Sequence, residues 1–270
     1  MSTTLPTLRD KITTVRDLIL SNRAQIELAL PKFMNTDRLV RTALTCFSTT
    51  PGLLDCTPRS LLGAVIQCAQ LGLEPGIIGM AYLIPFRNNK ANTVEVQFIP
   101  GYRGLLALAR RSGEISTIQA HCVQAEDHFK RQYGLNPVLD HVPSEKADRG
   151  AMTHVYAIAR LKDGGVQFET MTKAEVDAHR DRYSRAAKSG PWQTEYPEMA
   201  KKTVLRRLCK LLPASVELQT AVSLDERAEL QLPQGLTDLA PAGPEEPYSP
   251  EASSKLDKLA DEMSTSKDPA

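Results

Sequence analysis

Two stretches of this chain each contain a pair of alternating segments joined by a short polar turn. The first covers residues 80–99 around an asparagine-rich turn, and the second covers residues 153–171 around Asp163-Gly164-Gly165. Alternation of apolar and polar residues is typical of a half-buried strand, and a short turn between two such runs predicts an antiparallel hairpin. A further strand is expected at Ile115–Val123. The fold must therefore contain small antiparallel sheets.

The segments around these hairpins carry apolar residues at helical spacing. The helix after Thr57 has the clearest ends, because Thr57 is a good N-cap, Pro58 suits the first position and Gly72 suits the end. The expected helices cover residues 7–31, 35–47, 58–71, 102–111, 173–183 and 196–212. This order favours an α+β fold, with a small antiparallel sheet and a β-hairpin packed against helices, over a doubly wound sheet.

Charge is distributed unevenly along the chain, although the net charge is only +1. From Ala214 to Ala270 there are 12 acidic and 4 basic residues, whereas the rest of the chain holds 29 basic and 20 acidic ones. This asymmetry predicts a polyanion-binding domain over residues 1–231, helical in its part at about 7–72. Residues 232–270, rich in Pro, Gly, Glu and Ser, are expected to form an acidic, mostly disordered C-terminal tail. Chance clustering of surface charge is the alternative.

The segment Glu198–Leu212 is an amphipathic helix with cations opposite its apolar side. Lys202, Arg206 and Lys210 are spaced four residues apart and form a ladder along one stripe. A row of like charges without carboxylates between them repels itself and requires an anionic partner. A phosphodiester backbone is one such partner. The alternative is a solvated helix face that binds no ligand.

A second basic cluster lies on the helix expected at residues 102–111. Tyr102 and Arg103 lie between two glycines, whose small size lets a backbone or a ligand come close. Arg110 and Arg111 follow on the same helix. An aromatic ring beside cations is typical of single-strand binding. Alternatively, Tyr102 belongs to the core.

A third basic cluster precedes the only tryptophan. Residues 179–192 contain four cations, among them Lys188, and end at Trp192. A basic loop beside an aromatic ring again suits a single strand. Trp192 is equally well explained as a packing anchor.

Motifs of catalytic proteins are missing from the sequence. Gly76–Gly79 lacks the Lys-Ser/Thr pair of a phosphate-binding loop, which disfavours recombination driven by nucleotide hydrolysis. No tight acidic cluster suggests a two-metal nuclease, and the five cysteines lack metal-ligand spacing. We therefore expect no catalytic and no metal-binding residue. Without a secretory signal or an apolar span, we expect a cytoplasmic protein with no membrane partner.

Six motifs, in this order, resemble the RecT/Redβ family of phage-type single-strand DNA annealing proteins (recombinases). They are CTPRSLLGAVIQCAQLGLEPG (56–76), AYLIPF (81–86), GYRGLLALARRSG (101–113), THVYAIARLKDGG (153–165), GPW (190–192) and EMAKKTVLRRLCKLLP (198–213). The resemblance covers the chain from about Leu30 to Glu229. It implies a Rad52/Redβ-like annealing core and ATP-independent annealing of complementary strands in homologous recombination, without catalysis.

The resemblance also implies partners. These are single-stranded DNA, an annealed duplex intermediate, further copies of the chain in a ring or helical filament, a companion exonuclease and a host single-strand-binding protein. No cofactor is expected to be required, with Mg²⁺ left open as a modulator of DNA binding. Together with Lys188 and Trp192, the expected DNA-binding residues are Tyr102, Arg103, Arg110, Arg111, Lys201, Lys202, Arg206, Arg207 and Lys210.

Two other functions remain open at this point: a DNA nuclease, and a protein that passively coats single strands. A purely structural oligomer, which would show no salt-sensitive binding of nucleic acid, is also open. If annealing is correct, replacing Arg206 and Arg207 with alanine is expected to impair it while the fold melts normally.

Overall fold

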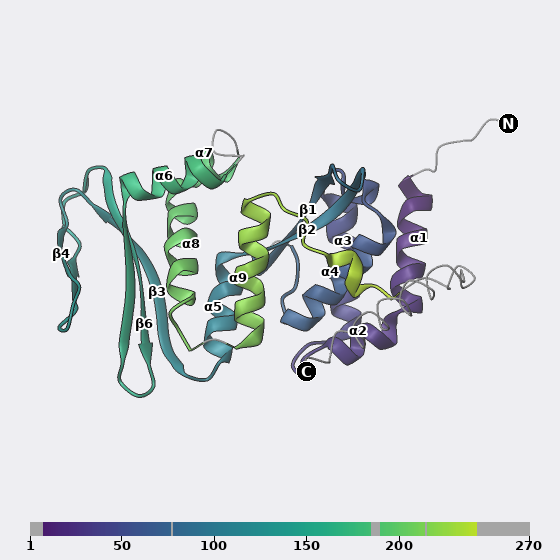
Figure 1. The fold of residues 1–270 in the computed structure, drawn as a ribbon, viewed down its shortest axis with the longest axis horizontal. Coiled ribbons are helices and arrows are strands. Elements are labelled where there is room, and N and C mark those ends of the chain that lie inside the picture. Colours follow the sequence, from purple (N-terminus) through teal and green to yellow (C-terminus); the bar gives the residue numbers. More distant parts are fainter. Residues whose placement is uncertain (1–7, 77, 185–189, 214, 242–270) are drawn as a thin grey trace, which may run out of the picture. The chain divides into compact units, whose positions relative to one another are not determined.

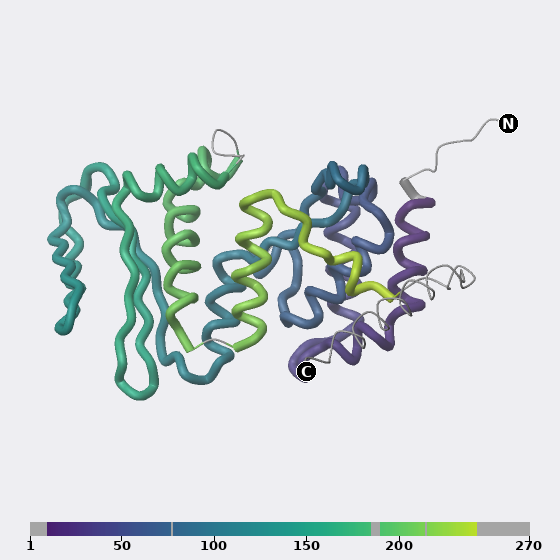
Figure 2. Tube along the Cα trace, in the orientation of Figure 1, coloured from purple at the N-terminus to yellow at the C-terminus, as the bar shows by residue number. Residues whose placement is uncertain are grey.

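The computed structural model describes residues 8–76, 78–184, 190–213 and 215–241. The chain divides into two compact units, Met1–Leu239 and Ala240–Ala270, and nearly all described residues belong to the first. This first unit combines helices with small antiparallel sheets (Figures 1 and 2). The α+β fold class expected from the sequence is thus confirmed.

Two helices, α1 (Leu8–Ser21) and α2 (Arg23–Ala29), replace the single helix expected over residues 7–31. The break lies at Asn22, whose φ of −102° and ψ of 15° depart from helical values. Its side-chain amide donates to the carbonyl of Leu18 at 2.8 Å. Asparagine competes with the backbone for hydrogen bonds in this way, so apolar periodicity alone does not reveal the break.

Helix α4 (Pro58–Leu71) is the central helix of the N-terminal part. It follows α3 (Thr36–Thr49) and a short 3-10 turn, η1 (Leu53–Asp55). Its ends confirm the sequence analysis, because the Thr57 side chain accepts a hydrogen bond from the Ser60 amide and Gly72 adopts a φ of 59°. Nearly all of α4 is buried, since helices α1, α2 and α3 and a β-hairpin pack around it.

That hairpin consists of β1 (Ala81–Asn88) and β2 (Thr93–Pro100), as expected, and α5 (Tyr102–Arg111) follows it directly. The outer edge of β2 is covered. The amide of Val96 donates to Ser60 Oγ at 3.1 Å, and the amide of Phe98 donates to Gln234 Oε1 at 2.7 Å. A covered edge cannot pair with a strand of another chain.

The main sheet has the antiparallel order β3 (Ile115–Gln124), β6 (Met152–Leu161), β7 (Val166–Thr172). Because side chains alternate along a strand, Val155, Ala157 and Ala159 share one face of β6, and all three are buried. Helix α8 (Tyr196–Cys209) packs on this side of the sheet (Figure 1). The small alanine side chains allow the helix to approach closely.

A second hairpin, β4 (His128–Gln132) and β5 (Val138–Val142), lies on the other side of the sheet (Figure 1). It was not expected, because its charged residues obscure the alternation. The buried carboxylate of Asp127 anchors it by accepting from Arg149 Nε at 2.8 Å and by contacting His141 Nε2 at 3.1 Å. The hydrogen bonds from Arg149 and from other donors hold the pKa of Asp127 well below its usual range.

Three helices complete the part around the main sheet. They are α6 (Lys173–Tyr183), α7 (Pro191–Thr194) and α9 (Val216–Glu229). Helix α6 covers the residues expected from the sequence, and its N-cap Thr172 forms a capping box with Glu175. Helix α9 was not expected as an element, and its carboxylates were counted with those of the acidic tail.

Composition predicted disorder from Leu232 onward, but the segment up to Leu239 is packed. Gln234 bonds to both backbone groups of Phe98, and η2 (Leu236–Leu239) lies against α4 with Leu236 only 3% exposed. The remainder of the predicted tail, residues 242–270, lies outside the described residues. Within the described part of the chain, no helix is long and apolar enough to cross a membrane.

Candidate nucleic-acid interface

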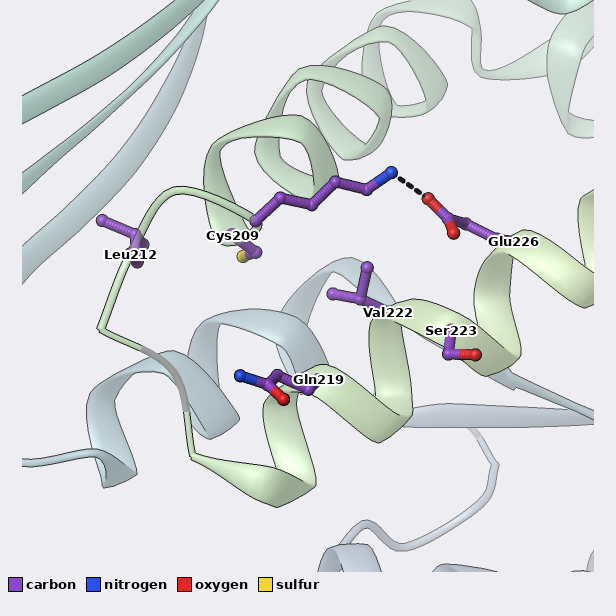
Figure 3. A pocket seen from close by; sticks show the side chains of 7 residues that line it. Cys209, Leu212, Gln219, Val222, Ser223 and Glu226 are labelled. Carbon is purple, nitrogen blue, oxygen red and sulfur yellow. Dashed lines mark ion pairs between the residues drawn. The ribbon is translucent and has the colours of Figure 1, made fainter. Parts of the chain in front are cut away.

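The ladder of cations on α8 faces acidic side chains of α9. Lys202 Nζ lies 2.6 Å from Asp225 Oδ1, and Arg206 Nη1 lies 2.9 Å from Asp225 Oδ2. Lys210 pairs with Glu226, as the dashed line in Figure 3 marks. The anionic partner that the ladder requires is therefore present within the chain. This pairing was not expected from the sequence, because α9 was not predicted as a helix.

Arg206 is the most deeply placed of these cations, with only 7% of its side chain exposed. Its guanidinium also pairs with Glu229 and lies 3.0 Å from His179 Nε2. Burial opposes its charge, but Asp225 and Glu229 outweigh burial and raise the pKa of Arg206. Because the Arg206 side chain joins α8 to α9, the variant with both Arg206 and Arg207 changed to alanine is now expected to lose stability rather than to melt normally. A DNA contact of Arg206 stays a prediction.

Arg111 is also engaged within the fold. Its guanidinium donates to the carbonyl oxygens of Leu71 and Gly72, both at 2.7 Å, and lies 4.5 Å from the centre of the Phe33 ring. Burial lowers the pKa of Arg111. These contacts satisfy the carbonyl groups at the end of α4. Arg111 thus ties α5 to α4.

The glycines on either side of Tyr102 and Arg103 allow backbone segments to come close together. A Cβ at Gly101 would lie 2.0 Å from the carbonyl oxygen of Gly79, and a Cβ at Gly104 would lie 2.1 Å from that of Met80. Both positions therefore have no room for a side chain. The close approach that the sequence suggested is made by the loop before β1.

Trp192 is buried, with 3% of the residue exposed, and its ring meets that of Tyr196 in a T-shaped contact at 5.8 Å. This position fits the alternative of a packing anchor. Lys188, which the sequence placed beside it, lies outside the described residues.

Four of the expected residues form what we call the α5–α8 surface: Tyr102, Arg103, Arg110 and Lys201. Arg103 and Arg110 are exposed, and within the described ranges neither forms an ion pair with a carboxylate. The half-buried ring of Tyr102 lies near Lys201 and Arg110, and burial raises the pKa of its hydroxyl. Lys201 itself forms an exposed ion pair with Glu198 at 2.5 Å. This surface presents cations around an aromatic ring.

Arg207, the remaining expected residue, is 3.2 Å from Glu169 on β7, with 47% of its side chain exposed. An exposed pair of this kind contributes at most about 1 kcal/mol and exchanges readily for another anion.

Two exposed cations that the sequence analysis did not single out are Arg131 and Arg160. Within the described part of the chain the Arg160 side chain forms no hydrogen bond or ion pair, and Arg131 donates to Thr170 Oγ1 at 2.6 Å. Strand alternation could have indicated Arg160, because it lies on the side of β6 opposite Ala159. Nothing in the sequence indicated Arg131, since its hairpin was not expected.

A hollow of about 280 Å³ lies between the end of α8 and α9, lined by Cys209, Gln219, Val222 and Glu226 among others (Figure 3). Burial raises the pKa of the Cys209 thiol to about 12, so it stays protonated at neutral pH. All five cysteines are free. Among the described residues, no group of three or more histidines, cysteines or acids could hold a metal ion.

Comparison with known proteins identifies the family. A sequence model described as the RecT family matches residues 37–235. The chain belongs to the RecT family. It is 47% identical over 215 residues to Protein RecT of Escherichia coli (strain K12), which covers 78% of this chain and 79% of that protein. It is 27% identical over 183 residues to the uncharacterized protein YqaK of Bacillus subtilis (strain 168), covering 66% and 60%.

Membership confirms the family expected from the six motifs. It places the chain among proteins of recombination by single-strand annealing. The matched residues include α5, α8 and α9 and therefore the whole α5–α8 surface.

Proposed function

We propose that this protein binds single-stranded DNA and pairs complementary strands without ATP and without catalysis. The observation that carries the proposal is the α5–α8 surface, where Arg103 and Arg110 lack a carboxylate partner among the described residues. The ring of Tyr102 lies near Lys201 and Arg110. Unpaired cations neutralise phosphates, and a half-buried aromatic ring can offer its accessible part to a base as a stacking partner.

Annealing breaks no bond, so the protein's task is electrostatic. Two polyanions repel each other, and cations on one backbone reduce that repulsion. Contacts confined to phosphate and sugar leave the base edges free to test a second strand. Correct pairing adds about 1.4 kcal/mol of stacking per base-pair step, so that a matched duplex is retained while a mismatched one dissociates. ATP is not needed because pairing is downhill.

The partners in this proposal are single-stranded DNA, the annealed duplex intermediate and further copies of the chain. A ring or helical filament would join the α5–α8 surfaces of successive copies into one continuous path for the strand. A companion exonuclease would supply single strands, and a host single-strand-binding protein would hold them. Mg²⁺ would act only by screening phosphates.

The two alternatives differ from annealing in measurable ways. A nuclease would digest labelled DNA in the presence of Mg²⁺ or Mn²⁺. A passive coating protein would bind strands but slow their pairing. We favour annealing because of the family to which the chain belongs.

The variant Arg103→Gln/Arg110→Gln tests the proposed surface. We expect its affinity for a fluorescein-labelled oligothymidine to fall by roughly tenfold in fluorescence anisotropy, because two phosphate contacts are lost. The dependence of log affinity on log salt concentration should become less steep by about 1.4, since each contact to a single strand contributes about 0.7.

The matched control is Arg16→Gln/Lys32→Gln, which removes two exposed cations that form no hydrogen bond or ion pair with other described residues. Its affinity and salt dependence should equal those of the parent protein. An equal loss in both variants would show that net charge alone attracts DNA, and the α5–α8 surface would then have no specific role.

A further inference from the structure

The outer face of the main sheet, opposite α8, has a composition unlike that of the inner face. On β6 it carries Tyr156, Ile158 and Arg160, which alternate with the buried Val155, Ala157 and Ala159. The register places Gln119 and His121 of β3 beside Ile158 and Tyr156, and Phe168 of β7 on the other side of Ile158. We call this set the outer face.

The hairpin of β4 and β5 covers only part of the outer face. The Phe129 ring stacks on Tyr156 at 5.9 Å, so this end is closed. Tyr133 lies 5.3 Å from the Phe168 ring but remains 55% exposed. Gln119, His121 and Arg160 are exposed as well. Rings and hydrogen-bonding side chains are therefore accessible at the Arg160 end of the face.

The charge on the outer face has one sign. The alternation of β3, β6 and β7 brings no aspartate or glutamate to it, and Glu169 of β7 points to the inner side, where it pairs with Arg207. Arg160 has no partner among the described residues, and Arg131 of β4 bonds only to Thr170. The charge of Arg131 contributes to lowering the pKa of Glu175, whose carboxylate is engaged in capping α6.

The outer face is continuous with the α5–α8 surface around one edge of the sheet. Strand β3 pairs only with β6 in the described sheet, and the Tyr102 hydroxyl of the α5–α8 surface hydrogen-bonds to the backbone of Ala120 on this strand. His121 lies at this edge, and its pKa is lowered by burial and by the charges of His141 and Lys201. The charge of Lys201 on the α5–α8 surface therefore reaches His121 on the outer face.

We propose that the outer face binds a second single strand of nucleic acid, with Arg131 and Arg160 on its phosphates and Tyr133, Phe168 and His121 beside its bases. A protein partner would bury a continuous apolar patch, whereas this face mixes exposed rings with neutral polar groups and guanidinium groups that form no ion pair with a carboxylate among the described residues. Exposed rings on a sheet surface suit unstacked bases, and unpaired cations suit a phosphate backbone.

This inference rests on the proposed function and adds that two different surfaces of the protein bind the two strands. One strand would lie on the α5–α8 surface and the incoming strand on the outer face, on the two sides of β3. Holding both strands on one protein raises the effective concentration of each for the other. Search for the complement then becomes a local process.

The test uses the full-length protein and two strands that cannot pair. The protein is first saturated with unlabelled oligothymidine, and labelled oligodeoxycytidine is then titrated into the complex. We expect the parent protein to bind the second strand. The variant Arg131→Gln/Arg160→Gln should bind it roughly tenfold more weakly, while its affinity for the first strand changes by less than about twofold.

The matched control is Arg16→Gln/Lys130→Gln. Lys130 lies on β4 next to Arg131, but alternation points it to the opposite side of the hairpin. This control should bind both strands like the parent. Ultraviolet crosslinking of a second strand containing 4-thiothymidine should label peptides with Tyr133 or Phe168 in the parent.

The outcomes separate the two proposals. If the parent protein binds no strand at all, the proposed function fails. If it binds the first strand but the Arg131→Gln/Arg160→Gln variant captures the second as well as the parent does, only the outer-face site is overturned. An equal loss of affinity for both strands would also overturn the outer-face site. It would likewise be overturned if the variant changed only the self-association of the protein and captured the second strand as before.

Discussion

The variant Asp225→Ala is expected to lose about 3–5 kcal/mol of folding free energy, because it leaves buried cations without their counter-ion. Only 5% of the Asp225 side chain is exposed, and it accepts from both Lys202 at 2.6 Å and Arg206 at 2.9 Å. Arg206 would then keep only Glu229 as a charged partner. The midpoint of thermal unfolding should fall by roughly 10 °C in a calorimetric scan.

The control for this variant is Glu126→Ala, which removes an ion pair with Lys146 whose side chains are 46% and 68% exposed. An exposed pair contributes at most about 1 kcal/mol, so the midpoint should move little. If Asp225→Ala melts like the parent protein, the ion pairs between α8 and α9 do not hold these helices together. The cations of α8 would then be available to DNA, as the sequence first suggested.

The variant Gly63→Ala is expected to destabilise the fold by about 2–3 kcal/mol through a clash with backbone. Its Cβ would lie 1.8 Å from the carbonyl oxygen of Leu236, where η2 crosses α4. Alanine in a helix interior gains up to about 1 kcal/mol over glycine, which offsets only part of the clash. The segment around Gln234 should detach, exposing the edge of β2 that it covers.

Limited proteolysis and hydrogen exchange at the Phe98 amide measure this detachment. The rate of proteolytic cleavage and the rate of hydrogen exchange should both increase in Gly63→Ala, and the midpoint of thermal unfolding should fall. Gly165→Ala is the control, because the nearest atom to its Cβ is a carboxylate oxygen of Asp163, 3.0 Å away, which can rotate aside. Unchanged protection of Phe98 in Gly63→Ala would mean that the helix and η2 shift apart without loss of packing.

Local signals in the sequence were sufficient for most helices and both long hairpins. The start of α4 at Thr57 and the start of α6 at Thr172 depend on residues within one turn, and both are confirmed. The break at Asn22 was missed because a side-chain hydrogen bond, rather than loss of apolar spacing, produces it. The hairpin of β4 and β5 depends on Asp127, whose partner Arg149 is distant in sequence.

For the candidate site, the sequence predicted which types of residue take part but not which of them are accessible. Composition and spacing identified cations suited to a polyanion, but the availability of each cation depends on pairing between distant segments. Arg206 is paired by α9, and Arg111 by the carbonyl groups at the end of α4. Arg110 remains exposed on the same helix as Arg111. Two neighbouring residues of one helix thus differ in role: Arg111 takes part in packing, whereas Arg110 lies on a surface that can receive a ligand.

Pairing of two complementary oligonucleotides in nucleotide-free buffer is the most direct measurement of the central claim. One strand carries a donor dye and the other an acceptor, and energy transfer is followed over time at a salt concentration where spontaneous pairing is slow. The account predicts that the protein accelerates pairing, that added ATP changes nothing, and that higher salt abolishes the acceleration. Pairing that is no faster than the spontaneous reaction, while both strands are bound, would contradict it.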